Sequence, residues 1–289
     1  MRLEGRRLSE NVEDRRRSKK APAAIGGLGV IIILIIGALL NVDVQPLVNQ
    51  MEQAAGPQAV GVDGAVGEPE ELTAEEEAQG VFVSQVLALT EDVWTGLLQQ
   101  YGVRYQAPKL VLFSKVDRSG CGVAQSATGP FYCPADSTIY IDTSFFNDLQ
   151  DRFGAPGDFA RAYVIAHEVG HHIQNLMGTT DKLDAMRGRI SEVEMNKMSV
   201  RLELQADFYA GVFAHYLRGE DRILERGDIE EALRCAGQIG DDRLQKASGG
   251  RVVPDSFTHG TSDQRQRWFL KGFESGDLAQ GDTFGETKL

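Results

Sequence analysis

The stretch His167-Glu168-Val169-Gly170-His171 decides how this chain is interpreted. Its two histidines stand four residues apart, and a glutamate directly follows the first. On an α-helix, side chains at positions i and i+4 lie on the same face. Two neutral imidazoles on one face can hold a single zinc ion, and a carboxylate beside them can reach a water molecule at that ion. The stretch therefore predicts a helical metal site.

The flanking residues favour a helix at this position. The run 159–166 is mostly apolar and contains neither proline nor glycine, so a buried helix can lead into the motif. Asp158 follows a turn-like segment with two glycines and is the expected N-cap, and Gly178 is the expected C-terminal stop. The alternative is an ordinary amphipathic helix with surface histidines, because short motifs also arise by chance.

A catalytic zinc ion needs a third protein ligand and one open position. Glu203 is the candidate ligand, and Asp207 lies four residues later on the same face of a predicted helix. Asp207 is expected to accept a hydrogen bond from the far ring nitrogen of a ligand histidine and so fix its tautomer. The alternative is two solvated acids. Their apolar neighbours argue against it, because a buried carboxylate needs a positive partner, which a metal supplies.

Composition limits the function classes. The chain has 289 residues, a formal net charge of −12 and a pI near 4.9. An acidic protein of this kind is not expected to bind nucleic acid. The length allows one substantial globular domain with accessory segments.

The N-terminal region has the pattern of a membrane anchor. Residues 1–20 are rich in arginine and lysine, and residues 21–41 form an uncharged run long enough to cross a lipid bilayer as a helix. The basic segment is expected to stay in the cytoplasm, which places residues 73–289 outside the inner membrane, in the periplasm or extracellular space. Residues 42–72 are expected to form a flexible acidic linker. A cleaved signal peptide is the alternative, but no small-x-small cleavage site follows the run.

The remaining residues predict an α+β domain with a small sheet and several helices. A capping box begins at Thr73, and a second helix start is expected near Thr90. Segments 109–116 and 138–142 read as strands. Further helices are expected around the metal motif, around Glu203, over 228–239 and over 261–273. Because strands come first and helices later, the pattern is typical of the α+β class.

The chain has three cysteines, and their environment depends on the compartment. Cys121 and Cys133 lie in predicted loops and can form a disulfide if the domain faces an oxidising space. Two free thiols are the alternative if the topology is reversed. Cys235 falls among alanines and leucine in a predicted helix and is expected to be a small buried apolar residue.

Several motifs together resemble the bacterial family of putative neutral zinc metallopeptidases with one N-terminal membrane anchor. The resemblance covers almost the whole chain and is far more specific than the central motif alone. The segments that carry it are 11–16 (NVEDRR), 129–136 (GPFYCPAD), 167–172 (HEVGHH), 203–207 (ELQAD) and 253–260 (VPDSFTHG).

This resemblance implies a zincin-like fold and assigns zinc binding to His167, His171 and Glu203. It also implies that residues 129–133 lie near the cleft, as an edge strand that pairs with an extended peptide. Some relatives carry cysteines at the positions of Phe208 and Gly281, so a second disulfide is not expected here.

The expected chemistry is amide hydrolysis by a zinc-activated water, with a peptide or protein as substrate. Glu168 is the candidate general base, and His259, in a loop-like segment, is the candidate donor to the oxyanion. The alternative for His259 is a loop histidine that bonds the backbone. His172 points away from the ligand face and is expected to pack or to support the ligands, and His215 has no assigned role.

Two other functions remain open at this stage. One is a non-catalytic envelope protein that binds a peptide or partner and uses zinc structurally. Glu168 disfavours this function, because a structural site needs no base. The other is a zinc hydrolase of non-peptide amides. The sequence leaves the oligomeric state and the cleavage preference undetermined.

Overall fold

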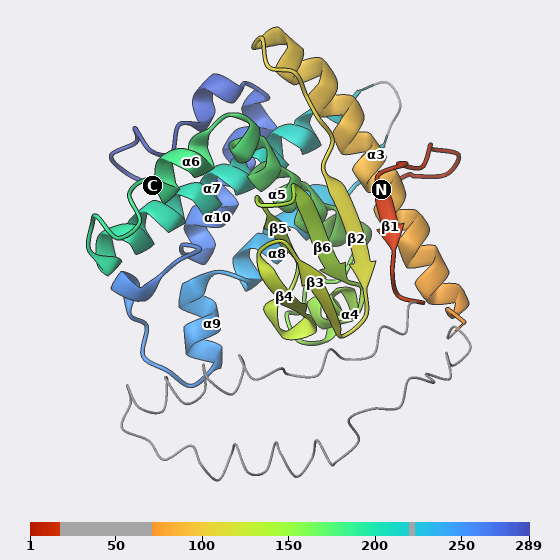
Figure 1. Cartoon of the computed structure of the whole chain (residues 1–289), viewed down its shortest axis with the longest axis horizontal. Coiled ribbons are helices and arrows are strands. Elements are labelled where there is room, and N and C mark those ends of the chain that lie inside the picture. Colours follow the sequence, from red (N-terminus) through yellow and green to blue (C-terminus); the bar gives the residue numbers. More distant parts are fainter. Residues whose placement is uncertain (18–70, 220–222) are drawn as a thin grey trace, which may run out of the picture. The chain divides into compact units, whose positions relative to one another are not determined.

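A four-stranded mixed sheet forms one layer of the protein, with the strand order β1-β2-β6-β5 (Figure 1). The central strands are β2 (Lys109–Phe113) and β6 (Thr138–Asp142), which confirms the two predicted strands, although the first ends three residues earlier. β1 (Val12–Asp14) pairs in parallel with β2, and β2 pairs in parallel with β6. β5 (Phe131–Cys133) pairs antiparallel with β6 at the opposite edge. The edge strands were not predicted from local pattern.

The computed structural model describes residues 1–17, 71–219 and 223–289. The predicted membrane helix at 21–41 and nearly all of the predicted linker lie outside the described residues. Met1–Arg16 form one compact unit with Leu72–Leu289.

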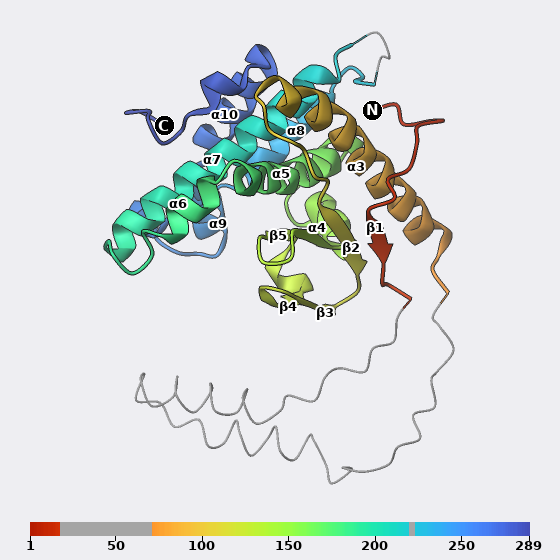
Figure 2. The ribbon, with the colours of Figure 1, turned by 45° about the horizontal axis from the view of Figure 1, so that its top comes forward.

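The two faces of the sheet bury different side chains, as the two-residue period of strands requires. One face packs into the main core, to which β2 and β6 contribute Leu110, Leu112, Ile139 and Ile141. The other face forms a smaller core with the hairpin of β3 (Val116–Ser119) and β4 (Gly122–Gln125). Figure 2 shows this hairpin on the opposite side of the sheet from α5.

Helix α3 (Ala74–Gln100) replaces the two helices predicted between Thr73 and Tyr101. Its capping box at Thr73 is present as expected, but the hydroxyl of Thr90 donates to the Leu87 carbonyl within the helix, so it starts no new one. Among the described residues, α3 is long and apolar enough to cross a membrane. More than half of its most apolar stretch is buried against the core, which is the behaviour of a core helix.

Most of the other helices contribute side chains to the main core. These other helices are α4 (Ser144–Asp151), α5 (Asp158–Leu176), α6 (Thr179–Asp184), α7 (Glu192–Tyr216), α8 (Asp228–Gln238), α9 (Asp241–Ala247) and α10 (Ser262–Ser275). The mixed α+β class is therefore confirmed for the described residues. Helix α7 lies between α5 and α10 (Figure 1).

Helix α5 begins differently from the prediction. Gly157, with φ 125°, is its N-cap, and Asp158 is the first helical residue. The Glu231 carboxylate accepts the backbone N–H of Phe159 at 3.0 Å and so satisfies a free donor of the first turn. A side chain at Gly157 would meet this carboxylate, so a distant residue provides the cap that local sequence could not show. Gly178, with φ 71°, ends the helix as predicted.

Helices α5 and α7 approach closely at the metal motif. A Cβ atom at Gly170 would lie 3.0 Å from the backbone oxygen of Ala206. The glycine inside the motif therefore permits the approach that brings Glu203 to the histidines. Phe208 and Gly281 are also neighbours, since a Cβ atom at Gly281 would lie 2.5 Å from the Phe208 ring.

Candidate metal centre

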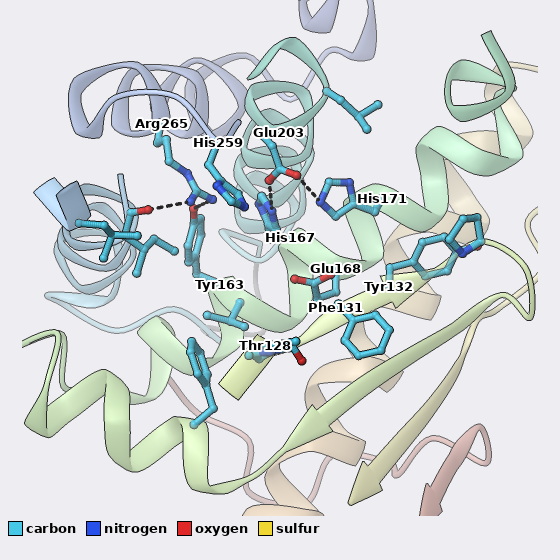
Figure 3. A pocket seen from close by; sticks show the side chains of 18 of the residues that line it. Thr128, Phe131, Tyr132, Tyr163, His167, Glu168, His171, Glu203, His259 and Arg265 are labelled. Carbon is cyan, nitrogen blue, oxygen red and sulfur yellow. Dashed lines mark hydrogen bonds and ion pairs between the residues drawn. The ribbon is translucent and has the colours of Figure 1, made fainter. Parts of the chain in front are cut away.

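Candidate ligand atoms from two helices converge beside a cavity. His167 and His171 come from adjacent turns of α5, and Glu203 comes from α7 (Figure 3). One carboxylate oxygen of Glu203 lies 3.1 Å from Nε2 of His167, and the other lies 3.5 Å from Nε2 of His171. A ligand atom from each residue lies within 4.8 Å of the others. The predicted trio is therefore brought together.

The far nitrogen of each histidine is held by an acceptor. Nδ1 of His167 lies 2.9 Å from Asp207, and Nδ1 of His171 lies 2.9 Å from the amide oxygen of Gln174. The Gln174 amide is oriented by its own donation to the Leu202 carbonyl at 2.7 Å. Both imidazoles can thus carry hydrogen on Nδ1 and turn Nε2 toward Glu203. Two such nitrogens and a carboxylate fit a zinc ion.

Asp207 belongs to a buried network that the sequence only partly indicated. Its carboxylate accepts hydrogen bonds from Nε and Nη2 of Arg265 at 2.8 and 3.0 Å and from the Tyr163 hydroxyl. Asp207 is fully buried and Arg265 is 3% exposed. Asp207 lies behind His167, as expected. Its positive partners are His167 and, in addition, Arg265 of α10.

The electrostatics of the metal-free cluster favour charged side chains. Burial opposes charge on His167, but the Asp207 and Glu203 carboxylates outweigh it and raise its pKa to about 10. The pKa of His171 is also raised, because Glu203 outweighs burial. Burial opposes the charge of Glu203, but His171 and His167 outweigh it and lower the pKa of Glu203 well below its ordinary value. Without a metal, protons on the histidines neutralise Glu203.

Zinc binding is therefore expected to release protons, because a metal can bind an imidazole nitrogen only after its proton leaves. Because the pKa of His167 is raised to about 10, this competition persists through neutral pH, and the raised pKa of His171 acts in the same direction. The apparent zinc affinity should rise with pH, about tenfold per unit for each proton displaced. Calorimetry in buffers of different ionisation enthalpy measures the release, with about one to two protons expected. An affinity independent of pH from 6 to 8 would contradict this electrostatic description.

Glu168 lies beside the ligands on the wall of a cavity of about 660 Å³. It follows His167 on α5, is 7% exposed, and faces the cavity toward Phe131 (Figure 3). Apolar and aromatic side chains form much of the remaining wall, among them Phe131, Phe145, Phe153, Val164 and Leu183. A carboxylate in this position can accept a proton from a water molecule held at the ligand trio.

His259 lies at the rim of the same cavity, and its side chain is half exposed. Asp241, at the start of α9, holds it in place. One carboxylate oxygen accepts the backbone N–H groups of Thr258, His259 and Gly260, and the other lies 3.1 Å from Nδ1 of His259. This hydrogen bond raises the pKa of His259. Sequence reasoning missed Asp241, because nothing local links it to a loop 18 residues away.

The remaining candidate residues have structural places. His172 is buried on α5 and contacts Tyr132 rather than the ligands. Cys121 and Cys133 form the expected disulfide and tie the β3–β4 hairpin to β5. Cys235 is a buried free thiol, as predicted. Nδ1 of His215 donates to the Phe273 carbonyl at 2.8 Å, outside the cavity.

The geometry defines the class of site: two histidines one helical turn apart, an acidic ligand from a second helix and a free glutamate, as in metal-dependent hydrolases. The chain belongs to the family described as putative neutral zinc metallopeptidase, whose sequence model matches residues 1–284. The family name implies zinc.

The relatives carry no further functional information. The uncharacterized protein YpfJ of Escherichia coli K12 is 47% identical over 299 residues, which cover 99% of this chain and 100% of that protein. The uncharacterized protein Rv2575 of Mycobacterium tuberculosis is 44% identical over 207 residues, or 68% of each chain. No solved structure matches the chain.

Proposed function

We propose that this protein is a zinc-dependent endopeptidase with a zincin-like catalytic unit. The observation that carries the proposal is the convergence of His167, His171 and Glu203 in a cavity that also holds Glu168. A purely structural zinc site would need no free carboxylate beside it and no open cavity. Membership of a zinc metallopeptidase family supports the same function.

The residues of the cavity divide the chemistry between them. His167, His171 and Glu203 would hold the zinc ion, which when bound supplies Lewis-acid polarisation and lowers the pKa of a water molecule. Glu168 accepts the proton of the attacking water and delivers it to the departing amine. His259, held by Asp241, donates a hydrogen bond to the carbonyl oxygen as negative charge develops on it. Gln174 and Asp207 keep the ligand histidines oriented.

An extended peptide is the substrate shape that the cavity favours. β5 forms one edge of the sheet, and its Phe131 and Tyr132 line the cavity. An edge strand can accept a further strand through main-chain hydrogen bonds, so a peptide added to β5 would pass the ligand trio. The aromatic and aliphatic wall of the cavity would favour apolar side chains in that peptide.

The direct test incubates the purified full chain, loaded with zinc, with a mixed peptide library and identifies cleavage sites by mass spectrometry. Cleavage should stop after chelation and return when zinc is added. A protein that holds zinc through these three residues but cleaves nothing in the library would reject the peptidase function. Release of acyl groups from non-peptide amides alone would reassign the substrate class.

Replacement of His259 tests its role as a donor. His259→Ala should lower kcat about 100-fold with little change in KM, because removal of one oxyanion donor typically costs this much and acts on the transition state. Steady-state kinetics on a cleaved peptide measure both constants. His215→Gln, which alters a histidine outside the cavity, serves as the control. A variant at position 259 with normal kcat would leave His259 as a loop residue only.

A further inference from the structure

We infer that His172 is a positioning residue that fixes strand β5 beside the metal ligands through Tyr132. Its effect on catalysis rests on the proposed peptidase function, whereas its effect on the strand does not. His172 directly follows the ligand His171 on α5, but its ring faces the sheet. One helix therefore carries both the metal ligands and the anchor of the strand that lines the cavity.

The hydrogen bonds around His172 form a chain with one consistent direction. Nε2 lies 2.6 Å from the Gln106 carbonyl, which can only accept, so Nε2 carries the hydrogen. Nδ1 is then an acceptor, and the Tyr132 hydroxyl donates to it at 3.0 Å. The same hydroxyl accepts from the amide of Asn175 at 3.1 Å. Tyr132 is thus fixed by two residues of α5.

The alternation of β5 makes Tyr132 its link to α5. Phe131 and Cys133 pack with Tyr140 in the smaller core, and Phe131 also reaches the cavity wall, whereas Tyr132 packs against the main core and makes the hydrogen bonds to α5. The strand has three residues and, among the described residues, pairs on one side only, with β6. Within the described part of the chain, the hydrogen bonds between β5 and α5 are those of the Tyr132 side chain. The contact between Tyr132 and α5 would therefore help to set the distance between a peptide bound to β5 and the metal ligands.

Tyr132→Phe tests the inference with the smallest change, because it removes one hydroxyl and keeps the ring. We expect amide exchange of residues 131–133 to quicken while exchange in α5 and zinc affinity stay unchanged. KM for a cleaved peptide should rise about fivefold with kcat nearly constant, the effect of losing one net hydrogen bond from ground and transition states alike. Tyr140→Phe removes a hydroxyl from the adjacent strand, away from the cavity, and is the matched control.

The outcomes separate this inference from the proposed function. Unchanged exchange at 131–133 overturns the positioning role, whether or not any peptide is cleaved. A fall in kcat at constant KM also overturns it, because Tyr132 would then act on the chemical step. His172→Gln, whose amide can both donate and accept, should restore slow exchange relative to His172→Leu. Absence of cleavage by the wild type rejects only the peptidase function.

A second observation stands independently: the structure assigns Met1–Arg16 and Leu72–Leu289 to the same side of any membrane to which the protein attaches. Strand β1 is hydrogen-bonded to β2 inside the folded unit. The Leu110 N–H donates to the Asn11 carbonyl at 2.9 Å, and the Arg15 N–H donates to the Leu112 carbonyl at 2.8 Å. Two strands of one sheet cannot lie on opposite sides of a bilayer.

Two N-terminal arginines, Arg7 and Arg16, bind groups of helix α3. Arg7 lies 2.9 Å from Glu91 and 2.7 Å from Asp92 on α3. The side chain of Arg16 is 1% exposed and donates to the Glu76 carbonyl at 2.6 Å. The sequence predicts that these charges keep the N-terminus in the cytoplasm, away from the domain. In the structure they join the N-terminal segment to the domain. A single membrane crossing between these two parts of the chain would break these contacts.

Cysteine labelling of the full chain in intact cells tests this assignment. Leu8→Cys and Val123→Cys introduce thiols at positions that are 52% and 58% exposed on the two parts. With a membrane-impermeant maleimide, both positions should react, or both should react only after permeabilisation. The native Cys235 is buried and should stay unlabelled under both conditions. Labelling of one position and protection of the other in intact cells would overturn the assignment and support the single-pass orientation.

Discussion

Glu168→Gln is expected to bind zinc normally and to lose nearly all hydrolysis of any peptide that the wild type cleaves. Glu168 faces the cavity but is not one of the three converging ligands, so its loss leaves the metal donors in place. The amide is nearly isosteric with the carboxylate and cannot accept the proton of water at neutral pH. General acid–base catalysis contributes about 10² to 10⁴ in rate, so kcat should fall by that factor.

Glu203→Gln is the matched control for that variant, since it makes the same change at the ligand position. It should lose zinc as well as activity, because an amide is a poorer ligand than a carboxylate. Metal content by elemental analysis and kcat by peptide assay separate the two variants. Unchanged turnover in Glu168→Gln would reject Glu168 as the base, and loss of its zinc would make it a ligand.

Local spacing predicts the ligand trio because helix geometry does most of the positioning. Residues four apart on a helix share a face. Once both segments are assigned as helices, this rule places His171 beside His167 and Asp207 beside Glu203. The contact between α5 and α7 was inferred from chemistry, because a buried carboxylate and two imidazoles can share one metal ion. Gly170 permits it, since its missing side chain lets α7 approach.

Arg265 and Asp241 were not predicted in their supporting roles, although Asp207 was, because tertiary packing brings each of the two from a distant element. Arg265 lies 58 residues from Asp207, and Asp241 lies 18 residues from His259. Arg265 leaves one usable signal, because it lies on the buried face of α10 with Trp268 and Phe269. A charge on an apolar face indicates a buried partner.

The N-terminal region shows a different limit of sequence reasoning. Hydropathy and flanking charge describe an apolar run by itself, and they assign its neighbours to opposite sides. They contain no information about whether those neighbours pair with each other. β1 has three residues, too few for a recognisable alternation, and its partner lies about a hundred residues later. Only the register of the sheet shows that the two ends belong together.

Asp207→Ala is expected to be the most destabilising single change among the site residues. It leaves the guanidinium of Arg265 buried without its carboxylate, and loss of one partner of a buried ion pair costs about 3 to 5 kcal/mol. Burial opposes the charge of Asp207, but Arg265 and His167 outweigh it and lower its pKa to about 2. Its stabilising contribution is therefore complete above its unfolded pKa, near pH 4, and is lost as the pH falls toward 2.

Urea unfolding of the metal-free protein at pH 7 measures this loss without the contribution of zinc. The double variant Asp207→Leu with Arg265→Met is the informative comparison, because it removes both charges and leaves none unpaired. It should be more stable than Asp207→Ala while binding zinc more weakly than the wild type, since His167 loses the acceptor at its Nδ1. If the double variant were no more stable than Asp207→Ala, packing of the aspartate, and not its charge, would account for the loss. A destabilisation below about 1 kcal/mol in Asp207→Ala would show that water reaches Arg265 and that the network is not sealed.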